Sequence, residues 1–317
     1  MFPFFQNLFI PLKGVPEKNR DEVALLKVTR YEQFTTALAY LVNEWLHNRL
    51  GEGAPKEPWD TDAVMKVNQL NGDPKGSIDD MDEETRTVFD KLIEIKLPGH
   101  LKIVASHRRW ICATFRFCKI VGVELSDQMA NLVWRHDLSK YSHKEVIGYA
   151  IMFGYAIMFG DGSIDFKQLQ TEQENTEWQH TLYNHYAHNP HHPEYFYPLQ
   201  ADGTRKRENS MKELDPVNGK HYLIESIIDM LASRGERYLS EDRVFSVTKW
   251  FDIPDKFLGR YCQADREYVV QKMDEWLQIA GHFMESAENI AMVQCLFDDR
   301  PVALDVLDDM KTIITHA

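Results

Sequence analysis

Apolar residues recur at helical spacing through four separate segments of this chain, and this periodicity is the feature that most limits its fold. Apolar residues three or four positions apart occupy one face of an α-helix. Patterns that alternate every second residue, as in a half-buried strand, are few. The four segments are residues 101–121, 126–136, 171–188 and 220–233. The periodicity therefore predicts an all-α fold.

The same segments carry signals for where their helices begin and end. Ser126 is a typical N-cap residue ahead of the apolar positions Met129 and Val133. Asn189-Pro190 is expected to end the helix over 171–188, because the residue before a proline disfavours helical dihedral angles. Helical patterns resume after residue 240, and the longest of these covers 262–285.

Charge and composition exclude several classes of function. The formal net charge of −13 opposes binding to a nucleic-acid polymer, which requires a basic surface. No apolar run approaches the roughly 18 residues that span a membrane, and the N-terminus lacks the basic start of a signal peptide. Cys112 and Cys118 lie in one apolar stretch without CxxC spacing, which indicates buried thiols in a reducing compartment. We therefore expect a cytoplasmic protein with no membrane partner.

Histidines are concentrated in one short stretch of the chain. Five of the 13 histidines fall within residues 180–192, and a His136-Asp137 pair stands upstream. Neutral imidazole is the commonest metal ligand in proteins, and a neighbouring carboxylate suits Zn, Mn or Fe. The alternative interpretation is a His-rich surface loop, since the NPHHPE segment is also favourable turn sequence. Both interpretations are compatible with this stretch alone.

The order of the polar residues along the helices favours a metal centre. Taken singly, His107 could be a core histidine, His136-Asp137 a helix cap and Asp229 an exposed acid. In order, however, they give a helix with His107, a helix ending in His136-Asp137, a helix with His185, and a helix with Asp229. Side chains on four helices that cross one core would converge on one point.

These residues resemble a known superfamily. The sequence HDLSK at 136–140 is similar to the HDxxK form of the HD-domain metal-dependent phosphohydrolases. The combination with HxxxNPHHxEY from His185 to Tyr195, and with ExxxD from Glu225 to Asp229, looks closer to a little-characterised HD-like branch without an assigned substrate. The resemblance covers about residues 101–235. Typical members spread the later histidines over two helices, so the resemblance does not decide which of these histidines bind.

The resemblance implies an HD-domain-like helical bundle, and the helical patterns on either side of it predict additional N- and C-terminal helices. The expected parts are an N-terminal helical extension over 1–100, a metal-binding core over 101–240, and C-terminal helices over 241–317 packed on that core. The implied cofactor is a divalent metal, one or two ions of Mn, Mg, Zn or Fe. The implied metal ligands are His107, His136, Asp137, His185, His191, His192 and Asp229.

The resemblance also implies a chemistry. It predicts a hydrolase for a phosphomonoester or phosphodiester, a nucleotide-like small molecule, in which metal-activated water attacks phosphorus. The expected catalytic residues are Asp137, Lys140 and Glu225, and the expected substrate contacts are Arg108, His188 and Lys140. Glu225 could instead orient a ligand histidine. Two other functions stay open: an HD-fold di-iron oxygenase, and a non-catalytic metal-binding regulatory protein.

Overall fold

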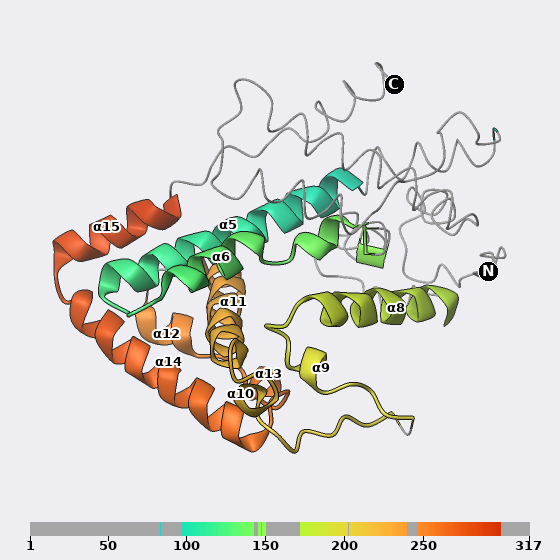
Figure 1. The fold of residues 1–317 in the computed structure, drawn as a ribbon. Helices are drawn as coiled ribbons and strands as arrows, with labels where there is room; N and C mark the ends of the chain where they lie inside the picture. The colour runs from blue at the N-terminus through green and yellow to red at the C-terminus, as the bar shows by residue number, and fades with distance from the viewer. Residues whose placement is uncertain are drawn as a thin grey trace. The chain divides into compact units, whose positions relative to one another are not determined.

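The computed structural model describes residues 83, 97–142, 145, 146, 148, 149, 172–201, 203–239 and 246–298. These residues are 73% helical and include no strand, which confirms the all-α prediction (Figure 1). An HD-like bundle in particular stays a prediction, and most of the expected extension over 1–100 lies outside the described residues. The longer helices are α5 (Leu97–Val121), α6 (Asp127–Arg135), α8 (Glu172–His188), α11 (Gly219–Leu239), α14 (Gln263–Phe283) and α15 (Ala287–Asp298). The shorter ones are η4 (Leu138–Tyr141), α9 (Pro193–Phe196), α10 (Met211–Leu214), α12 (Val247–Phe251) and α13 (Asp255–Leu258).

The chain divides into two compact units that are interleaved in sequence. Unit 1 comprises Met1–Val104, Leu138–His185 and Leu304–Ala317, and unit 2 comprises Ala105–Asp137 and Tyr186–Ala303. Helices α5 and α8 each contribute residues to both. The three-part division expected from the sequence stays a prediction.

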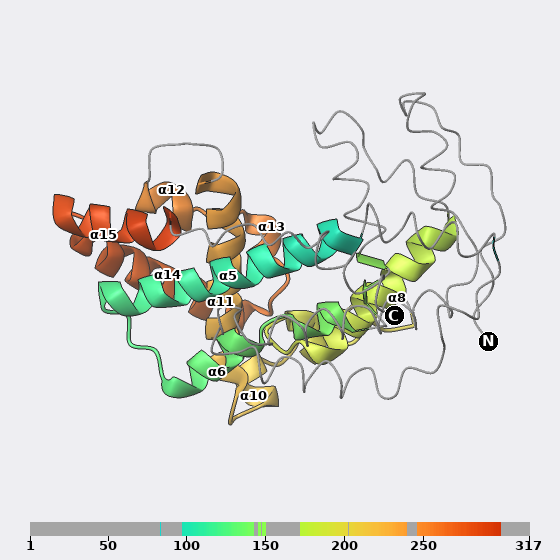
Figure 2. The same cartoon turned by 90° about the horizontal axis from the view of Figure 1, so that it is seen from above.

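Helix α11 is the centre of unit 2. It packs against α6, α10, α12 and α14, and Figure 2 gives a second view of these helices. Its apolar residues Ile227, Ile228 and Leu231 are fully buried and Ile224 is nearly so, as the periodicity predicted. Each such side chain contributes about 1.5–3 kcal/mol of burial free energy. These four apolar residues of α11 therefore stabilise the packing of unit 2.

An aromatic cluster joins three helices of unit 2 beside α11. The ring of Trp250 on α12 lies 4.7 Å from that of Phe117 on α5 and 5.1 Å from that of Phe297 on α15, centroid to centroid. The Trp250 indole Nε1 donates a hydrogen bond of 2.6 Å to the Leu231 carbonyl oxygen. Because this buried donor is satisfied, the indole both fills the core and fixes the position of α12 on α11.

Gly235 of α11 marks the closest approach between that helix and the cluster. A Cβ at this position would lie 2.9 Å from Trp250 Nε1 and 3.3 Å from Trp110. We therefore expect Gly235→Ala to lower the free energy of unfolding by about 1–2 kcal/mol, because overpacking outweighs the gain in helix propensity. Gly281→Ala is the matched control, since nothing lies within 4 Å of its added Cβ. Chemical denaturation should show Gly281→Ala unchanged or stabilised, and equal effects of the two variants would contradict the packing argument.

The helix ends follow ordinary capping chemistry. Gly122 has a φ of +100° directly after α5. The Gly122 amide donates to the Lys119 carbonyl (3.2 Å) and the Val123 amide to that of Cys118 (2.8 Å), which is the Schellman arrangement. Ser126 caps α6 through its side chain, as predicted. Helix α8 ends at His188, directly before Asn189-Pro190, which confirms that prediction too.

The buried cysteines agree with the sequence interpretation. Cys112 and Cys118 are both buried on α5. Burial raises the pKa of the Cys118 thiol to about 12, so this side chain is an uncharged apolar core group at neutral pH. None of the helices in the described part of the chain has the length and apolar character that a membrane crossing requires.

The described part of unit 1 centres on a buried ring stack. The His100 ring lies parallel to that of Tyr149, with centroids 5.7 Å apart, and Trp178 meets Tyr149 edge-on at 5.2 Å. His100 Nε2 lies 3.0 Å from the Lys140 carbonyl oxygen. Burial lowers the pKa of His100 to about 4, against the raising effect of that carbonyl contact.

This histidine predicts an acid sensitivity of the fold. A histidine whose pKa is lower in the folded state binds its proton more tightly when unfolded, so its contribution to stability is complete above pH 6.5 and is lost as the pH falls toward 4. Between about pH 7 and about pH 5 the free energy of unfolding should fall by about 2 kcal/mol from His100. His100→Gln keeps a donor for the Lys140 carbonyl but cannot titrate. Denaturation at both pH values should show a smaller loss in the variant, and an equal loss would exclude His100 as the cause.

Candidate metal centre

The His-Asp pair lies at a reversal of the chain after α6. Helix α6 ends at Arg135, His136 is its C-cap, and Asp137 has a φ of +57°. Asp137 is the one non-glycine residue with a positive φ among those that the structure describes. This left-handed conformation costs about 1–2 kcal/mol but is tolerated by aspartate. It brings Asp137 Oδ2 to 3.4 Å from His136 Nε2, whereas adjacent residues of a regular helix point about 100° apart.

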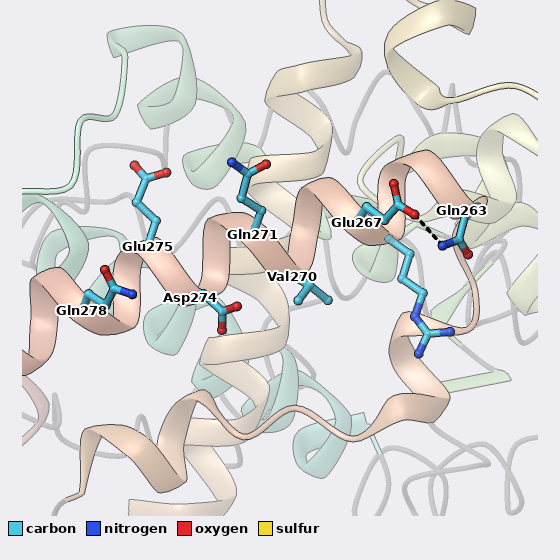
Figure 3. Close-up of a pocket in the computed structure, with 8 residues that line it drawn as sticks. Gln263, Glu267, Val270, Gln271, Asp274, Glu275 and Gln278 are labelled. Carbon is cyan, nitrogen blue, oxygen red and sulfur yellow. Dashed lines mark hydrogen bonds between the residues drawn. The ribbon is translucent and has the colours of Figure 1, made fainter.

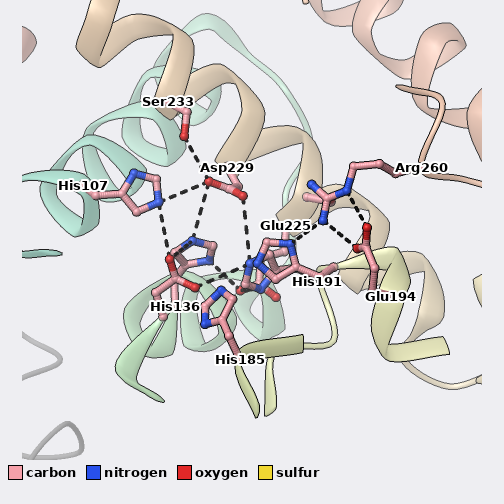
Figure 4. Close-up of polar contacts among 12 residues, drawn as sticks. His107, His136, His185, His191, Glu194, Glu225, Asp229, Ser233 and Arg260 are labelled. Atoms are coloured by element: carbon pink, nitrogen blue, oxygen red, sulfur yellow. Dashed lines mark hydrogen bonds and ion pairs between the residues drawn. The ribbon is translucent and has the colours of Figure 1, made fainter. Parts of the chain in front are cut away.

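Helices α5 and α11 add one residue each to this pair. His107 Nε2 on α5 lies 3.2 Å from Asp229 Oδ1 on α11 and 3.6 Å from Asp137 Oδ2. His136 Nε2 lies 3.7 Å from Asp229 Oδ1. The structure therefore brings together His107, His136, Asp137 and Asp229, which the sequence placed in this order along its helices. Figure 4 labels His107, His136 and Asp229.

His191 supplies a third imidazole from the turn after α8. This turn is closed by a 3.0 Å hydrogen bond from the His192 amide to the Asn189 carbonyl. The His191 side chain is 2% exposed, and its Nε2 lies 3.7 Å from Asp137 Oδ1 and 3.9 Å from Asp229 Oδ2. Three Nε2 atoms thus face the same two carboxylates, in a core that excludes most water.

A second layer of carboxylates lies behind the imidazoles. Glu225 Oε1 lies 3.0 Å from His136 Nδ1 and 3.5 Å from His191 Nδ1. An Nδ1–H that points at a carboxylate leaves the Nε2 lone pair facing the other way, which is the orientation of a metal-ligating histidine. His107 has Glu236 at 3.8 Å from its Nδ1, longer than a hydrogen bond.

The electrostatics of the cluster show an excess of negative charge. Burial alone would lower the pKa of His136, but the surrounding carboxylates of Asp137, Glu225 and Asp229 outweigh burial and raise it to about 10. Burial opposes ionisation of Asp229 as well, yet the three imidazoles hold its pKa below the usual range. Burial raises the pKa of Glu225 despite its contact with His136. The cluster therefore attracts a cation, a proton in the metal-free protein or a metal ion in its place.

This buried cluster could bind a metal ion. Two sets of three ligand atoms lie within 4.8 Å of one another inside unit 2, His107, His136 and Asp137 in one and His136, His191 and Asp229 in the other. His136 Nε2 is buried and makes no hydrogen bond, as expected for an atom reserved for a ligand. The imidazole and carboxylate donors suit a divalent transition metal.

His185 belongs to unit 1, where a carboxylate also orients it. Its Nδ1 lies 2.9 Å from Glu145 Oε2, and Glu145 also accepts hydrogen bonds from Asn184 Nδ2 (2.7 Å) and Ser139 Oγ (3.1 Å). Glu145 is completely buried. His185 thus has the tautomer of a ligand, while its predicted place in the metal centre stays a prediction.

The three predicted substrate-binding residues differ in their environments. Arg108 is buried and donates a 2.7 Å hydrogen bond to the Trp134 carbonyl near the end of α6, so it positions the His136-Asp137 turn. Lys140 Nζ lies 5.3 Å from the centroid of the Tyr149 ring, and His188 is exposed at the end of α8. The substrate roles of all three stay predictions.

Three charged residues that face predicted ligands were not identified from the sequence. Glu236 follows Asp229 by seven positions, so the helical periodicity of α11 could have placed it on the same face. Glu145 lies 40 positions from His185 in sequence. Arg260, which has a guanidinium nitrogen 3.1 Å from His192 Nδ1, lies 68 positions from that histidine. No motif marks either residue. Arg260 lies outside the stretch that resembles the HD superfamily.

A depression on the surface of unit 2 has no such chemistry. A depression of about 620 Å³ runs along α14 and is lined by Gln263, Arg266, Glu267, Val270, Gln271, Asp274, Glu275 and Gln278 (Figure 3). Apart from the half-buried Arg266, all of these side chains are exposed on one helix face. Exposed side chains of mixed charge do not desolvate a ligand, so the histidine cluster is the better candidate site.

A helical fold with a buried His/Asp cluster defines a candidate metal-binding protein. A family model, described as a family of unknown function (DUF5662), matches residues 98–275, and the chain belongs to this family. The match includes every residue of the cluster. No curated protein and no solved structure matched the chain.

Proposed function

We propose that the protein is a metal-dependent phosphohydrolase whose metal is held by His107, His136, His191, Asp137 and Asp229. The observation that carries this proposal is the convergence of three Nε2 atoms and two carboxylates, with distances of 3.2–3.9 Å between them. A divalent metal bound among these donors would lower the pKa of a water molecule and polarise a phosphoryl oxygen. Of the ions expected from the sequence, Mn, Fe and Zn suit three imidazoles better than Mg does.

The residues of the chain have separate tasks in this proposal. Glu225 orients His136 and His191, and the strained turn at Asp137 holds its carboxylate toward three imidazoles. The buried walls exclude bulk water, which strengthens each electrostatic contact. The chain has a net charge of −13, so the attraction for a phosphorylated small molecule must come from the metal and from local cations.

The arrangement of the carboxylates in the cluster is compatible with a second metal ion. Asp137 directs Oδ2 toward His107 and His136 and Oδ1 toward His191. Asp229 divides its oxygens in the same way. A carboxylate that faces two donor groups can bridge two ions, and such pairs serve hydrolases and di-iron oxygenases alike. This observation favours the oxygenase as the second candidate function.

Metal analysis followed by activity screening tests the proposal. The purified protein should contain one or two transition-metal ions per chain by elemental analysis. It should release phosphate from a panel of nucleotides and sugar phosphates when Mn, Mg, Co, Ni and Fe are supplied in turn. Iron content with oxygen consumption and no phosphate release would favour the oxygenase. Bound metal without either reaction would favour a regulatory protein.

A further inference from the structure

His192 directly follows the proposed ligand His191 in sequence, but its Nδ1 faces a hydrogen-bond donor and not a carboxylate. An Arg260 guanidinium nitrogen lies 3.1 Å from His192 Nδ1. A guanidinium group only donates hydrogen bonds, so Nδ1 must be the acceptor. A neutral imidazole whose Nδ1 accepts has its proton on Nε2. His192 is therefore held in the tautomer opposite to the one that Glu225 favours for His136 and His191 as metal ligands.

The arginine that sets this tautomer is itself fixed. Arg260 Nε donates to Glu194 Oε1 (2.8 Å), and a terminal nitrogen of Arg260 donates to Glu194 Oε2 (2.6 Å) (Figure 4). Two parallel hydrogen bonds lock the plane of the guanidinium group. Burial would lower the pKa of Arg260, but Glu194 outweighs it and holds the pKa above the usual range.

The position of His192 places its ring beside the cluster. Its ring centroid lies 4.1 Å from that of His191. One of its ring nitrogens lies within 4.8 Å of ligand atoms of Asp137 and His191. A nitrogen that carries a proton cannot bind a metal ion, but it can donate a hydrogen bond to an anion bound there.

We propose that His192 is an anion-binding residue and not a metal ligand, and that its Nε2–H donates a hydrogen bond to an oxygen of the phosphoryl group. Arg260 and Glu194 act through it as positioning residues. This inference rests on the proposed function, because the phosphoryl group is expected at the metal. It divides the adjacent histidines by role: His191, backed by Glu225, binds the metal, and His192, backed by Arg260, binds the substrate.

The tautomer can be measured without metal or substrate. Nitrogen-15 NMR of labelled protein distinguishes a protonated Nε2 from a protonated Nδ1, and His192→Gln identifies the signals of His192. We expect His192 to carry its proton on Nε2 in both the metal-free and the zinc-loaded protein. A proton on Nδ1 would overturn the proposal.

Measurements of zinc and phosphate binding distinguish the proposed roles of His191 and His192. His192→Ala should keep the zinc stoichiometry of the wild type, whereas His191→Ala should lower the zinc affinity at least 10-fold. His282→Ala, at an exposed histidine on α14, is the control. Inorganic phosphate should bind about 10-fold more weakly to zinc-loaded His192→Ala, since a hydrogen bond to a charged group is lost. His192→Gln should restore most of this affinity, because its amide nitrogen takes the place of Nε2.

The outcomes distinguish the two proposals. Loss of zinc from His192→Ala as severe as from His191→Ala would make His192 a ligand and overturn the inference. Unchanged phosphate binding in His192→Ala would also overturn it, while leaving the metal centre intact. If the wild-type protein takes up no transition metal, both the proposed function and the anion-binding role of His192 are wrong.

Discussion

Asp137→Ala is expected to abolish phosphate-ester hydrolysis and to weaken metal binding about 1,000-fold or more. Both Asp137 oxygens face imidazole nitrogens within 3.4–3.7 Å, so the variant loses a charge that serves the whole cluster. Loss of one carboxylate ligand can cost several kcal/mol of transition-state stabilisation through metal loss or a misplaced water. Phosphate release and zinc affinity, measured on the same preparations, check the two effects together.

Asp137→Gly is the matched variant, because the φ of +57° at this position penalises alanine more than glycine. Both variants lack the carboxylate, so both should lose metal and activity alike. The metal-free Gly variant should be more stable than the metal-free Ala variant by about 1 kcal/mol. If the Gly variant kept metal and turnover, the loss in Asp137→Ala would come from backbone strain, and the His-Asp pair would not be part of the site.

The sequence predicted the helices of this protein better than the second layer of its site. Periodicity located the buried stripe of α11, and capping chemistry located the start of α6 and the end of α8. These features depend on residues within a few positions of each other, so one sequence contains the necessary information. The same holds for the order of His107, His136, Asp137 and Asp229, because each of these four residues lies on or directly after a helix that the sequence predicts.

The orienting residues depend on tertiary contacts and could not be predicted. Arg260 meets His192 across 68 positions of chain, and Glu145 meets His185 across 40. Neither contact follows from periodicity or from local turn chemistry. The partner of each Nδ1 atom decides which ring nitrogen carries the proton. The sequence therefore showed a group of histidines without showing which of them have the tautomer of a metal ligand. Carboxylates stand behind His136, His191 and His185, and an arginine stands behind His192.

The left-handed conformation of Asp137 could not be predicted from the sequence either. The sequence placed His136 and Asp137 at the end of a helix, but the backbone conformation that turns both side chains into the cluster was not predicted. A positive φ at a non-glycine residue persists only where surrounding contacts stabilise it. Arg108 supplies one such contact through its hydrogen bond to the Trp134 carbonyl.

Glu225→Ala is expected to weaken metal binding about 100-fold while leaving every proposed ligand in place. Its Oε1 atom serves His136 and His191 together, and loss of one such partner typically costs 10–100-fold in metal affinity. Without Glu225, the His136 Nδ1–H loses its hydrogen-bond acceptor and the His191 Nδ1–H loses the carboxylate that it faces, so both imidazoles can rotate. Competition with a chelator of known affinity measures the effect directly. Glu236→Ala is the control: its carboxylate lies 3.8 Å from His107 Nδ1, so it should change the affinity by only a few-fold.

Glu225→Gln then separates the two roles open to this residue. Glutamine keeps the shape and an acceptor oxygen but has no charge and no basicity. If Glu225 orients the ligands, the Gln variant should lose about 10-fold in metal affinity, and its turnover at saturating metal should stay near that of the wild type. If Glu225 is a general base, metal affinity should change little and turnover at saturating metal should fall by 100-fold or more. The position of Oε1, 3.0 Å from His136 Nδ1 and 3.5 Å from His191 Nδ1, favours the first result, because a carboxylate that already faces two imidazole N–H groups is poorly placed to take a proton from water.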